Sequence, residues 1–510
     1  MRLVYRIFYK SAAITRQGES MEKNTQNGIS INDLAVFCKK KGFVFQNSEL
    51  YNGLAGFWDF GPLGVELFNN IKASWWKRFV QSRPDVVGMD GSIISHWRVW
   101  KASGHIENFS DISVKCSRCG KINKIDKAEL GKARCEFCGG ELDEKTAKEI
   151  KLLFPVSVGS DNITAYLRGE TAQEMFINFK IIAETMRLKL PFGIAQAGRC
   201  FRNEIAPRDF LFRCREFHIA EFEYFINPNA KGCPMLDSEH LGLKLRLLDA
   251  ETQESGSDKM SEVTIEDMVS RGLLDEWHAY WLAEQLMWYM SLGLSYDKLR
   301  VRQHMKEELA HYSTVTFDID YDFPFGFKEI SGIANRGQYD LKRHMEESGE
   351  SFEYFDDETG SKVIPRVIEP SFGLERAFLA VIAEAYKYDE ERGNIVLSIK
   401  PELAPIKVAV LPLLSNRPEL LELAQEVYAL LRAEFASTYD KSGSIGRRYA
   451  RQDEIGTPLC VTVDFESISN RDVTIRDRDS TRQVRVKISE LQQVLSELIS
   501  GKKRFSDLIS

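Results

Sequence analysis

The residues best suited to binding a phosphate ester lie between positions 202 and 217. Arg202 and Glu204 are two apart in a strand-like run, so their side chains point to the same side of the backbone. Arg213 and Phe217 follow after a short loop. A nucleoside triphosphate needs cations for its phosphates, an aromatic face for its base and an acceptor for the adenine amino group. These four residues supply all three, although a salt-bridged surface hairpin would carry similar charges.

A further cation stands at the start of a predicted helix, in the run Ser371-Phe372-Gly373-Leu374-Glu375-Arg376. The two elements resemble motif 2 (Phe-Arg-x-Glu, then Arg and Phe) and motif 3 of the class II aminoacyl-tRNA synthetases. The resemblance implies that Arg202 neutralises the α-phosphate of ATP and that Arg376 packs on adenine and reaches the terminal phosphate. Since adenylate formation builds negative charge on phosphorus, such fixed cations would be the catalyst.

Other runs resemble signatures of the homodimeric glycyl-tRNA synthetases, and these are Arg168–Gln173, Glu329–Arg336, Glu369–Ser371 and Arg451–Pro458. The resemblance implies a glycine-tRNA ligase that forms glycyl-adenylate from glycine and ATP and then transfers glycine to the 3′ end of tRNA(Gly). The chain departs from the family in motif 1, where His96-Trp97 stands in place of the usual proline. That departure concerns the dimer interface more than the chemistry.

The same resemblance implies a set of glycine-binding residues. Three carboxylates would surround the ammonium group, one arginine would bind the carboxylate and one serine would lie near the α-carbon: Glu170, Glu221, Glu369, Arg336 and Ser371. For Glu170 and Glu221, plainer roles at a helix start and on a solvent-facing strand remain open. Glu329, with Asp322, would hold magnesium, because that ion prefers oxygen ligands.

Four of the nine cysteines form two Cys-x2-Cys pairs, Cys116/Cys119 and Cys135/Cys138, separated by fifteen residues. This is zinc-ribbon spacing, and four thiolates without an open position predict a structural zinc ion. Reduced thiols without metal are the alternative. Because the cysteines are too unevenly placed for a disulfide scaffold, a reducing compartment fits better.

The elements that position these residues predict an α+β fold. We expect a class II catalytic domain with an antiparallel sheet over residues 21–400, carrying a zinc-ribbon-like insertion at 107–155 and a second insertion at 227–296. Beyond Lys400-Pro401 the pattern changes to alternating strands and helices. Residues 401–510 resemble the α/β anticodon-binding domain that the glycyl, threonyl, prolyl and histidyl enzymes share.

A cluster of arginines in this last domain, Arg447, Arg448 and Arg451, would contact tRNA beside the ring of Tyr449. Residues 401–510 hold 16 Lys plus Arg and 16 Asp plus Glu, so the net charge of this domain does not predict RNA binding. A solvated loop is the alternative for the cluster.

Composition limits the class of protein. With 43% hydrophobic and 28% charged residues this is an ordinary globular enzyme, and the net charge of −7 argues against non-specific coating of nucleic acid. No apolar run is long enough to span a membrane. We therefore expect a cytoplasmic protein without membrane partners, and the resemblance to the homodimeric glycyl-tRNA synthetases implies a homodimer. Residues 1–20 carry Lys and Arg with a single acid, Glu19, which is typical of a targeting segment. We favour instead Met21 as the start of the protein, and we expect residues 1–20 to be a disordered extension.

Two other functions remain to be weighed. One is another class II synthetase with the same anticodon domain, specific for threonine, proline or histidine. The other is a non-catalytic, synthetase-like subunit that binds nucleic acid. The presence of Arg202, Glu204 and Arg376 argues against the second, because such a subunit would not need them.

Overall fold

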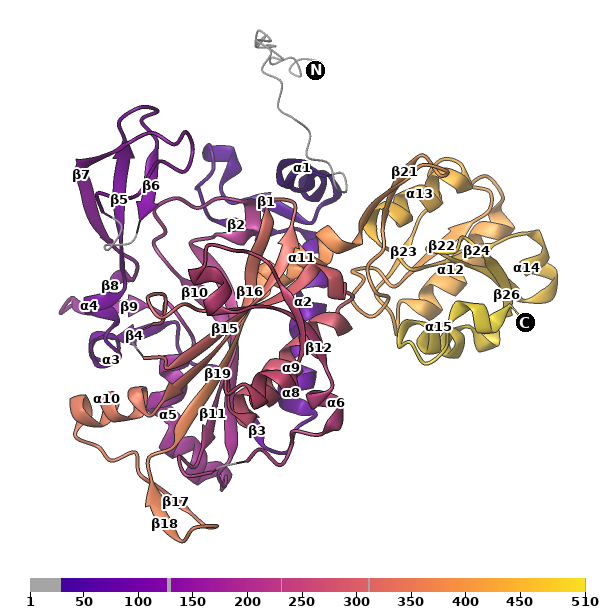
Figure 1. The fold of residues 1–510 in the computed structure, drawn as a ribbon. Coiled ribbons are helices and arrows are strands. Elements are labelled where there is room, and N and C mark those ends of the chain that lie inside the picture. The colour runs from indigo at the N-terminus through magenta and orange to yellow at the C-terminus, as the bar shows by residue number, and fades with distance from the viewer. Residues whose placement is uncertain (1–28, 126–129, 231, 311, 510) are drawn as a thin grey trace.

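The structure is a computed structural model that describes residues 29–125, 130–230, 232–310 and 312–509. The expectations for the extension 1–20 and for Met21 lie outside these residues. A large α+β body is joined to a smaller α/β body formed by the C-terminal residues (Figure 1). Among the described residues, no helix is long and apolar enough to cross a membrane.

A nine-stranded sheet is the frame of the large body. Its order is β13-β12-β14-β15-β16-β19-β11-β10-β3, and neighbours are antiparallel except β10/β3 and β12/β14. The strands are β3 (Val86–Gly88), β10 (Phe192–Phe201), β11 (Glu216–Ile226), β12 (Lys244–Leu248), β13 (Ser261–Thr264), β14 (Leu299–Gln303), β15 (Val315–Phe323), β16 (Gly326–Gly337) and β19 (Arg366–Gly373). The predicted antiparallel-sheet catalytic domain is confirmed.

The two faces of this sheet have different roles. Phe222 and Tyr224 of β11 pack in the main core with helices α2 (Pro62–Trp76), α9 (Glu276–Ser291) and α11 (Leu374–Ala385). Because side chains alternate along a strand, Glu221 and Glu223 point to the opposite face. Phe225, on that same opposite face, packs with α5 (Ala172–Met186), and α10 (Tyr339–Ser348) lies beside α5. The sheet therefore carries carboxylates on one face and its core on the other.

The segment 227–296, expected as a second insertion, is built into this frame. Strands β12 and β13 extend the sheet, and α9 buries Trp277, Trp281 and Trp288 in the main core. Its first part is polar because a strand near the edge of a sheet is buried on one face only. The tryptophans of α9 supply the apolar surface that covers the sheet.

The cysteine-containing insertion stands away from the large sheet, at the upper left of Figure 1. It is a three-stranded sheet of order β6-β5-β7, from β5 (Ser110–Cys116), β6 (Ile122–Ile125) and β7 (Leu142–Lys151). At its base lies another three-stranded sheet, β4 (Ile94–His96), β9 (Ile163–Leu167) and β8 (Phe154–Val158). Helices α3 (Trp97–Ala102) and α4 (His105–Asn108) lead into the insertion.

The C-terminal body has its own core and a five-stranded sheet of order β23-β22-β24-β25-β26. Its strands are β22 (Val408–Pro412), β23 (Ser437–Tyr439), β24 (Leu459–Val463), β25 (Asp472–Asp477) and β26 (Gln483–Lys487). Its helices are α12 (Pro418–Leu431), α13 (Ile445–Ile455), α14 (Phe465–Asn470) and α15 (Leu491–Ile499). The predicted C-terminal α/β domain is confirmed. A hairpin of β20 (Tyr386–Asp389) and β21 (Asn394–Leu397) follows α11 directly and packs against α13.

Shorter elements complete the fold. They are α1 (Ile31–Lys41), β1 (Val44–Gln46), β2 (Trp58–Phe60), α6 (Ser238–Leu241), α7 (Ala250–Glu254), α8 (Ile265–Ser270), β17 (Tyr354–Asp356) and β18 (Ser361–Val363).

Candidate active site

An open cavity of about 660 Å³ lies between the loop that follows β10 and the start of α11. Every residue expected to bind ATP lines it: Arg202, Glu204, Arg213, Phe217, Glu329 and Arg376. Ser371 lines it as well. These distant segments converge because β11 pairs with β19, which runs directly into α11.

Aromatic rings hold the two main cations of the cavity. The guanidinium carbon of Arg202 lies 5.4 Å from the ring centre of Phe217 and 5.3 Å from that of Phe109. The guanidinium carbon of Arg376 lies 4.5 Å from the ring centre of Phe212. A ring orients a guanidinium without neutralising it. Arg202 therefore keeps its charge for an anionic ligand, whereas Arg376 shares its charge with Glu329, whose carboxylate it contacts at 3.0 Å.

Glu204 is held as an acceptor at the same cavity. Its side chain is largely buried, and its Oε2 lies 3.7 Å from Nε of Arg213. Within the described part of the chain this oxygen accepts no hydrogen bond. Arg215 fixes the backbone here, because its Nε and Nη2 donate to the carbonyl oxygen of Glu204 at 3.0 and 2.8 Å. A ligand with a donor group can use this acceptor.

The two residues expected to hold magnesium are placed differently. Glu329 lines the cavity, with its Oε2 3.0 Å from Nη1 of Arg376. Asp322 is exposed on β15, opposite Phe327, and is not among the lining residues. The carboxylate of Glu329 could hold a magnesium ion at this cavity, whereas the structure does not bring Asp322 to the cavity.

Next to the cavity, a buried cluster gathers the charged residues expected to bind an amino acid. Glu170, Glu221, Glu369 and Arg336 are each less than a tenth exposed. Arg336 donates Nη1 to Glu369 at 2.7 Å, and its Nε and Nη2 to Asp340 at 2.8 Å each. These bonds use three of the five N–H groups of the guanidinium, and Nη2 also lies 3.8 Å from Oε1 of Glu170.

Each carboxylate of the cluster has its own environment. Glu221 accepts from the backbone N–H and the hydroxyl of Thr171 and from the hydroxyl of Ser371, at 2.8 Å for Ser371. Burial, and then the charge of Glu170, raise the pKa of Glu221 above its usual range. Because Glu221 is only 4% exposed, the alternative of a solvent-facing strand residue is wrong.

The pKa values of the other two glutamates move in opposite directions. Burial raises the pKa of Glu369 to about 8, although Arg336 opposes the shift. Burial would also raise the pKa of Glu170, but His105, 3.2 Å away, and Arg336 hold it below its usual range. At neutral pH, Glu170 is therefore charged while Glu369 holds a proton much of the time.

Sequence reasoning missed several members of the cluster. Asp340 binds Arg336, and Gln173 donates its amide to Glu170 at 2.9 Å and to Asp340 at 3.0 Å. Helix spacing gave no signal for this pair, because Arg336 lies on β16 and Asp340 on α10. Glu223 is fully buried, and its two carboxylate oxygens have no hydrogen-bond partner among the described residues.

The four cysteines of the insertion come together. Their Sγ atoms all lie within 4.8 Å of one another, with 3.6 Å between Cys116 and Cys138 and between Cys119 and Cys135. Backbone N–H groups of Cys119 and Arg118 donate to Sγ of Cys116 at 3.4 and 3.3 Å, which lowers its pKa. Four thiols so arranged fit one tetrahedral ion such as zinc.

The arginine cluster of the C-terminal domain divides on α13. Arg447 is exposed, and Arg451 pairs with Asp440 at 2.6 Å while staying partly exposed. Arg448 is 1% exposed, and its guanidinium donates to the carbonyl oxygens of Leu413 at 3.3 Å and Gly443 at 3.1 Å. The expectation that Arg448 contacts tRNA is corrected, because the helix turns it inward.

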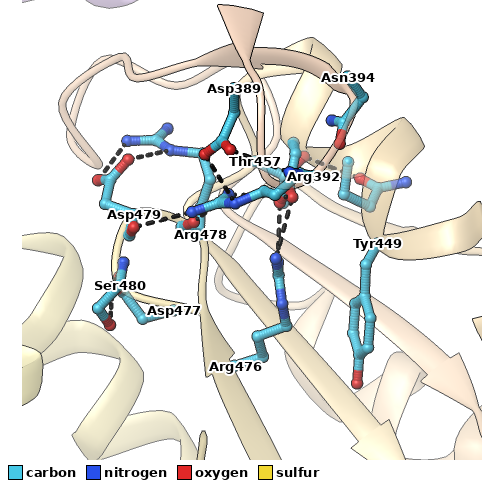
Figure 2. A network of polar contacts seen from close by, with 12 residues as sticks. Asp389, Arg392, Asn394, Tyr449, Thr457, Arg476, Asp477, Arg478, Asp479 and Ser480 are labelled. Carbon is cyan, nitrogen blue, oxygen red and sulfur yellow. Dashed lines mark hydrogen bonds and ion pairs between the residues drawn. The ribbon is translucent and has the colours of Figure 1, made fainter. Parts of the chain in front are cut away.

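The Arg451–Pro458 run begins on α13, which packs against the β20–β21 hairpin, and Figure 2 shows the polar network around Arg392, Thr457 and Arg476 there. Asp453 accepts from Nη1 and Nη2 of Arg476 at 2.8 and 2.9 Å, and from Arg392 of the β20–β21 hairpin at 3.3 Å. Arg392 also donates to the carbonyl oxygens of Arg478 and Asp479 at 2.8 and 2.9 Å. This run therefore anchors the C-terminal body to the larger one.

Known proteins resemble the chain along almost its whole length. A family model described as "Anticodon binding domain" matches residues 407–498. The glycine–tRNA ligase of Borrelia hermsii is 41% identical over 488 residues, covering 94% of this chain and 100% of that protein. That of Geobacillus kaustophilus is 43% identical over 504 residues, covering 92% and 99%.

A solved structure shows a similar fold. It is a prolyl-tRNA synthetase from Cryptosporidium parvum, with a TM-score of 0.56 and 13% identity, covering 92% of this chain and 75% of that one. At this identity the likeness concerns the fold alone.

Proposed function

Because the chain belongs to the glycine–tRNA ligase family and so ligates glycine to tRNA, we propose that the cavity and the adjoining carboxylate cluster are where glycine meets ATP. One observation carries this proposal. Ser371 lines the cavity and also donates its hydroxyl to Glu221 of the cluster. The proposed amino-acid and ATP sites are thus contiguous.

In the first step, a carboxylate oxygen of glycine attacks the α-phosphorus of ATP, and pyrophosphate leaves. Arg202 binds the α-phosphate, where negative charge builds up. Arg376 covers adenine and reaches the terminal phosphate, and Phe217 stacks on the base from the other side. Arg213 adds positive charge, and Glu204 accepts from the adenine amino group. Because rings and backbone hold these groups, they need little reorganisation as charge develops.

The cluster would recognise glycine by its charges. Glu170, Glu221 and Glu369 surround the ammonium group, and the two remaining N–H groups of Arg336 bind the carboxylate. Since glycine offers no side chain to bind, discrimination against larger amino acids has to be steric, with Ser371 close to the α-carbon.

Two metals belong to the proposal. Glu329 would hold magnesium, and Asp322 remains the predicted second ligand; the ion supplies positive charge beside the phosphates. Zinc bound by Cys116, Cys119, Cys135 and Cys138 would be structural, since the four thiolates leave no open position.

In the second step, a 3′-terminal ribose hydroxyl of tRNA(Gly) attacks the glycyl carbonyl carbon, and AMP leaves. Arg447 and Arg451 of the C-terminal domain would contact the tRNA. We also propose that the protein is cytoplasmic, because the cysteines of the described residues form no disulfide, as expected in a reducing compartment. We propose a homodimer because the sequence motifs resemble those of the homodimeric glycyl-tRNA synthetases.

An ATP–pyrophosphate exchange assay with each of the twenty amino acids tests the function. Glycine is expected to support exchange, and alanine to support it poorly. If threonine, proline or histidine were the better substrate, the glycine assignment would be wrong while the class II chemistry would stand. Absence of exchange with every amino acid would favour the non-catalytic alternative.

A further inference from the structure

Glu223 differs from every other carboxylate of the amino-acid cluster. It lies two residues after Glu221 on β11, so both side chains point to the same face. Glu221 accepts three hydrogen bonds and Glu369 accepts one from Arg336. Glu223 is 0% exposed, and neither of its oxygens has a hydrogen-bond partner in the described part of the chain.

The main charged neighbours of Glu223 lie on four elements. Glu221 lies on β11, Glu369 on β19, Arg336 on β16 and Asp340 on α10. The only cation among these four, Arg336, is already engaged by Asp340 and Glu369. Counting Glu170, five buried carboxyl groups share one guanidinium, and Nε2 of the nearby His105 lies 3.2 Å from Glu170.

A carboxylate in this position has neither water nor a donor to stabilise its charge. A neutral carboxyl group avoids most of that penalty. Burial and the charge of Glu369 accordingly raise the pKa of Glu223 well above its usual range. Its burial, the lack of a hydrogen-bond donor among the described residues and the neighbouring carboxylates all favour the protonated form of Glu223 in the empty site.

We propose that Glu223 releases this proton to solvent when glycine binds, so that the ammonium group of glycine replaces the proton as the positive charge in the cluster. The inference rests on the proposed function, because it takes the ammonium group to be the cation that these carboxylates receive. Only the O–H bond of Glu223 breaks. The protein with protonated Glu223 binds zwitterionic glycine. The products are a complex in which Glu223 is ionised and one proton that passes into solution.

Proton release makes glycine affinity depend on pH in a defined direction. In the range where the empty site is protonated and the complex is not, a higher pH favours the complex. The affinity therefore increases as pH rises, by up to about tenfold per pH unit for each proton released. Glycolate, which has a hydroxyl group where glycine has its ammonium group, brings no positive charge and is expected to release no proton.

Calorimetric titration of the full chain with glycine measures the proton directly. The titration is run at pH 7 in two buffers of different ionisation enthalpy, and the difference in observed heat gives the protons released per glycine. The wild-type protein is expected to release about one proton per glycine. Glu223→Gln keeps the size of the side chain without the acid and is expected to release less than half as many.

Three further titrations separate the outcomes. Glu216→Gln changes an acid on the same strand that pairs with Arg199 at 2.6 Å outside the cluster, and its release should match the wild type. Glu223→Asp keeps an acid and should keep the release, which provides a second variant if Glu223→Gln folds poorly. Glycolate with the wild type should give no release.

The inference is overturned if the wild type binds glycine with equal heat in both buffers. It is also overturned if Glu223→Gln releases as many protons as the wild type, because the source would then be another residue. Failure of the wild type to bind glycine at all, including with ATP present, would instead overturn the proposed function.

Discussion

Asp340 joins Arg336 by two parallel hydrogen bonds of 2.8 Å, and both side chains are at least 98% buried. Removing one partner of such a pair leaves a buried charge with too few acceptors. We expect Asp340→Ala to lower the free energy of unfolding by about 3–5 kcal/mol, measured by denaturant titration. Glu346→Ala, which breaks the exposed pair with Arg343, should cost less than about 1 kcal/mol. If Asp340→Ala lowered the free energy of unfolding no more than Glu346→Ala does, the buried pair would contribute no more to stability than the exposed pair.

Arg202→Ala should nearly abolish adenylate formation in a folded protein. The variant has no cation to bind the reacting phosphate, and such a cation stabilises the transition state by about 3 kcal/mol or more. ATP–pyrophosphate exchange measures the effect. Arg199→Ala, which changes an arginine three residues earlier whose side chain pairs with Glu216, should keep near-normal exchange. Near-normal exchange in Arg202→Ala would contradict the assignment of this residue to ATP.

Glu221→Gln should raise the KM for glycine much more than the KM for ATP. The change removes charge from the proposed ammonium site while leaving the ATP cavity intact. Removal of one charge-assisted hydrogen bond corresponds to about 1.5–3 kcal/mol, or roughly ten- to a hundredfold in KM. Steady-state exchange kinetics with each substrate varied in turn separate the two effects. An increase confined to ATP would remove Glu221 from the glycine site.

Cys116→Ser or Cys135→Ser should release close to one equivalent of zinc per chain. Because a structural metal contributes folding free energy directly, the segment 107–155 should also become more susceptible to proteolysis. Metal analysis and limited proteolysis measure the two effects. Cys233→Ser, at a buried cysteine far from the cluster in sequence, should retain zinc. Zinc-free wild-type protein would rule the site out.

Arg447 and Arg448 are neighbours with opposite expected effects. Arg447→Ala should raise the KM for tRNA about two- to fivefold, because one exposed charge interaction with the RNA is removed, without changing stability. Arg448→Ala should lower the free energy of unfolding by about 2–4 kcal/mol, because buried carbonyl groups no longer have their donor. Aminoacylation kinetics and thermal unfolding distinguish the two. A tRNA defect in a fully stable Arg448→Ala would restore that residue as an RNA contact.

The ATP cavity could be predicted from the sequence because its residues lie in three short runs, 202–217, 329–336 and 371–376. Arg202, Glu204, Arg213 and Phe217 share one hairpin, and the chemistry of ATP requires their residue types. The amino-acid cluster could be predicted only in part. The carboxylate oxygens of Asp340 meet Arg336 because α10 starts just after β16, and residue types alone do not reveal that turn.

Other differences have the same physical origin. Arg448 looked like an RNA contact because a run of arginines does not reveal which face of a helix is buried. On α13 the buried side chains are Arg448, Gln452 and Asp453, so no apolar periodicity marks the inner face. The pairing of β12 with β14 and the packing of α9 in the main core are tertiary contacts, which the sequence pattern of residues 227–296 does not reveal.

The interaction of Arg392 with Asp453 has a consequence for how the protein unfolds. If either body unfolded alone, Arg392 would be separated from its acceptors, and the buried pair of Asp453 with Arg476 would be opened to water. Each body therefore stabilises the other, although each has its own core. Heating is expected to melt the two bodies in one cooperative transition, and in native-state hydrogen exchange the amides of α13 are expected to open together with those of the β20–β21 hairpin.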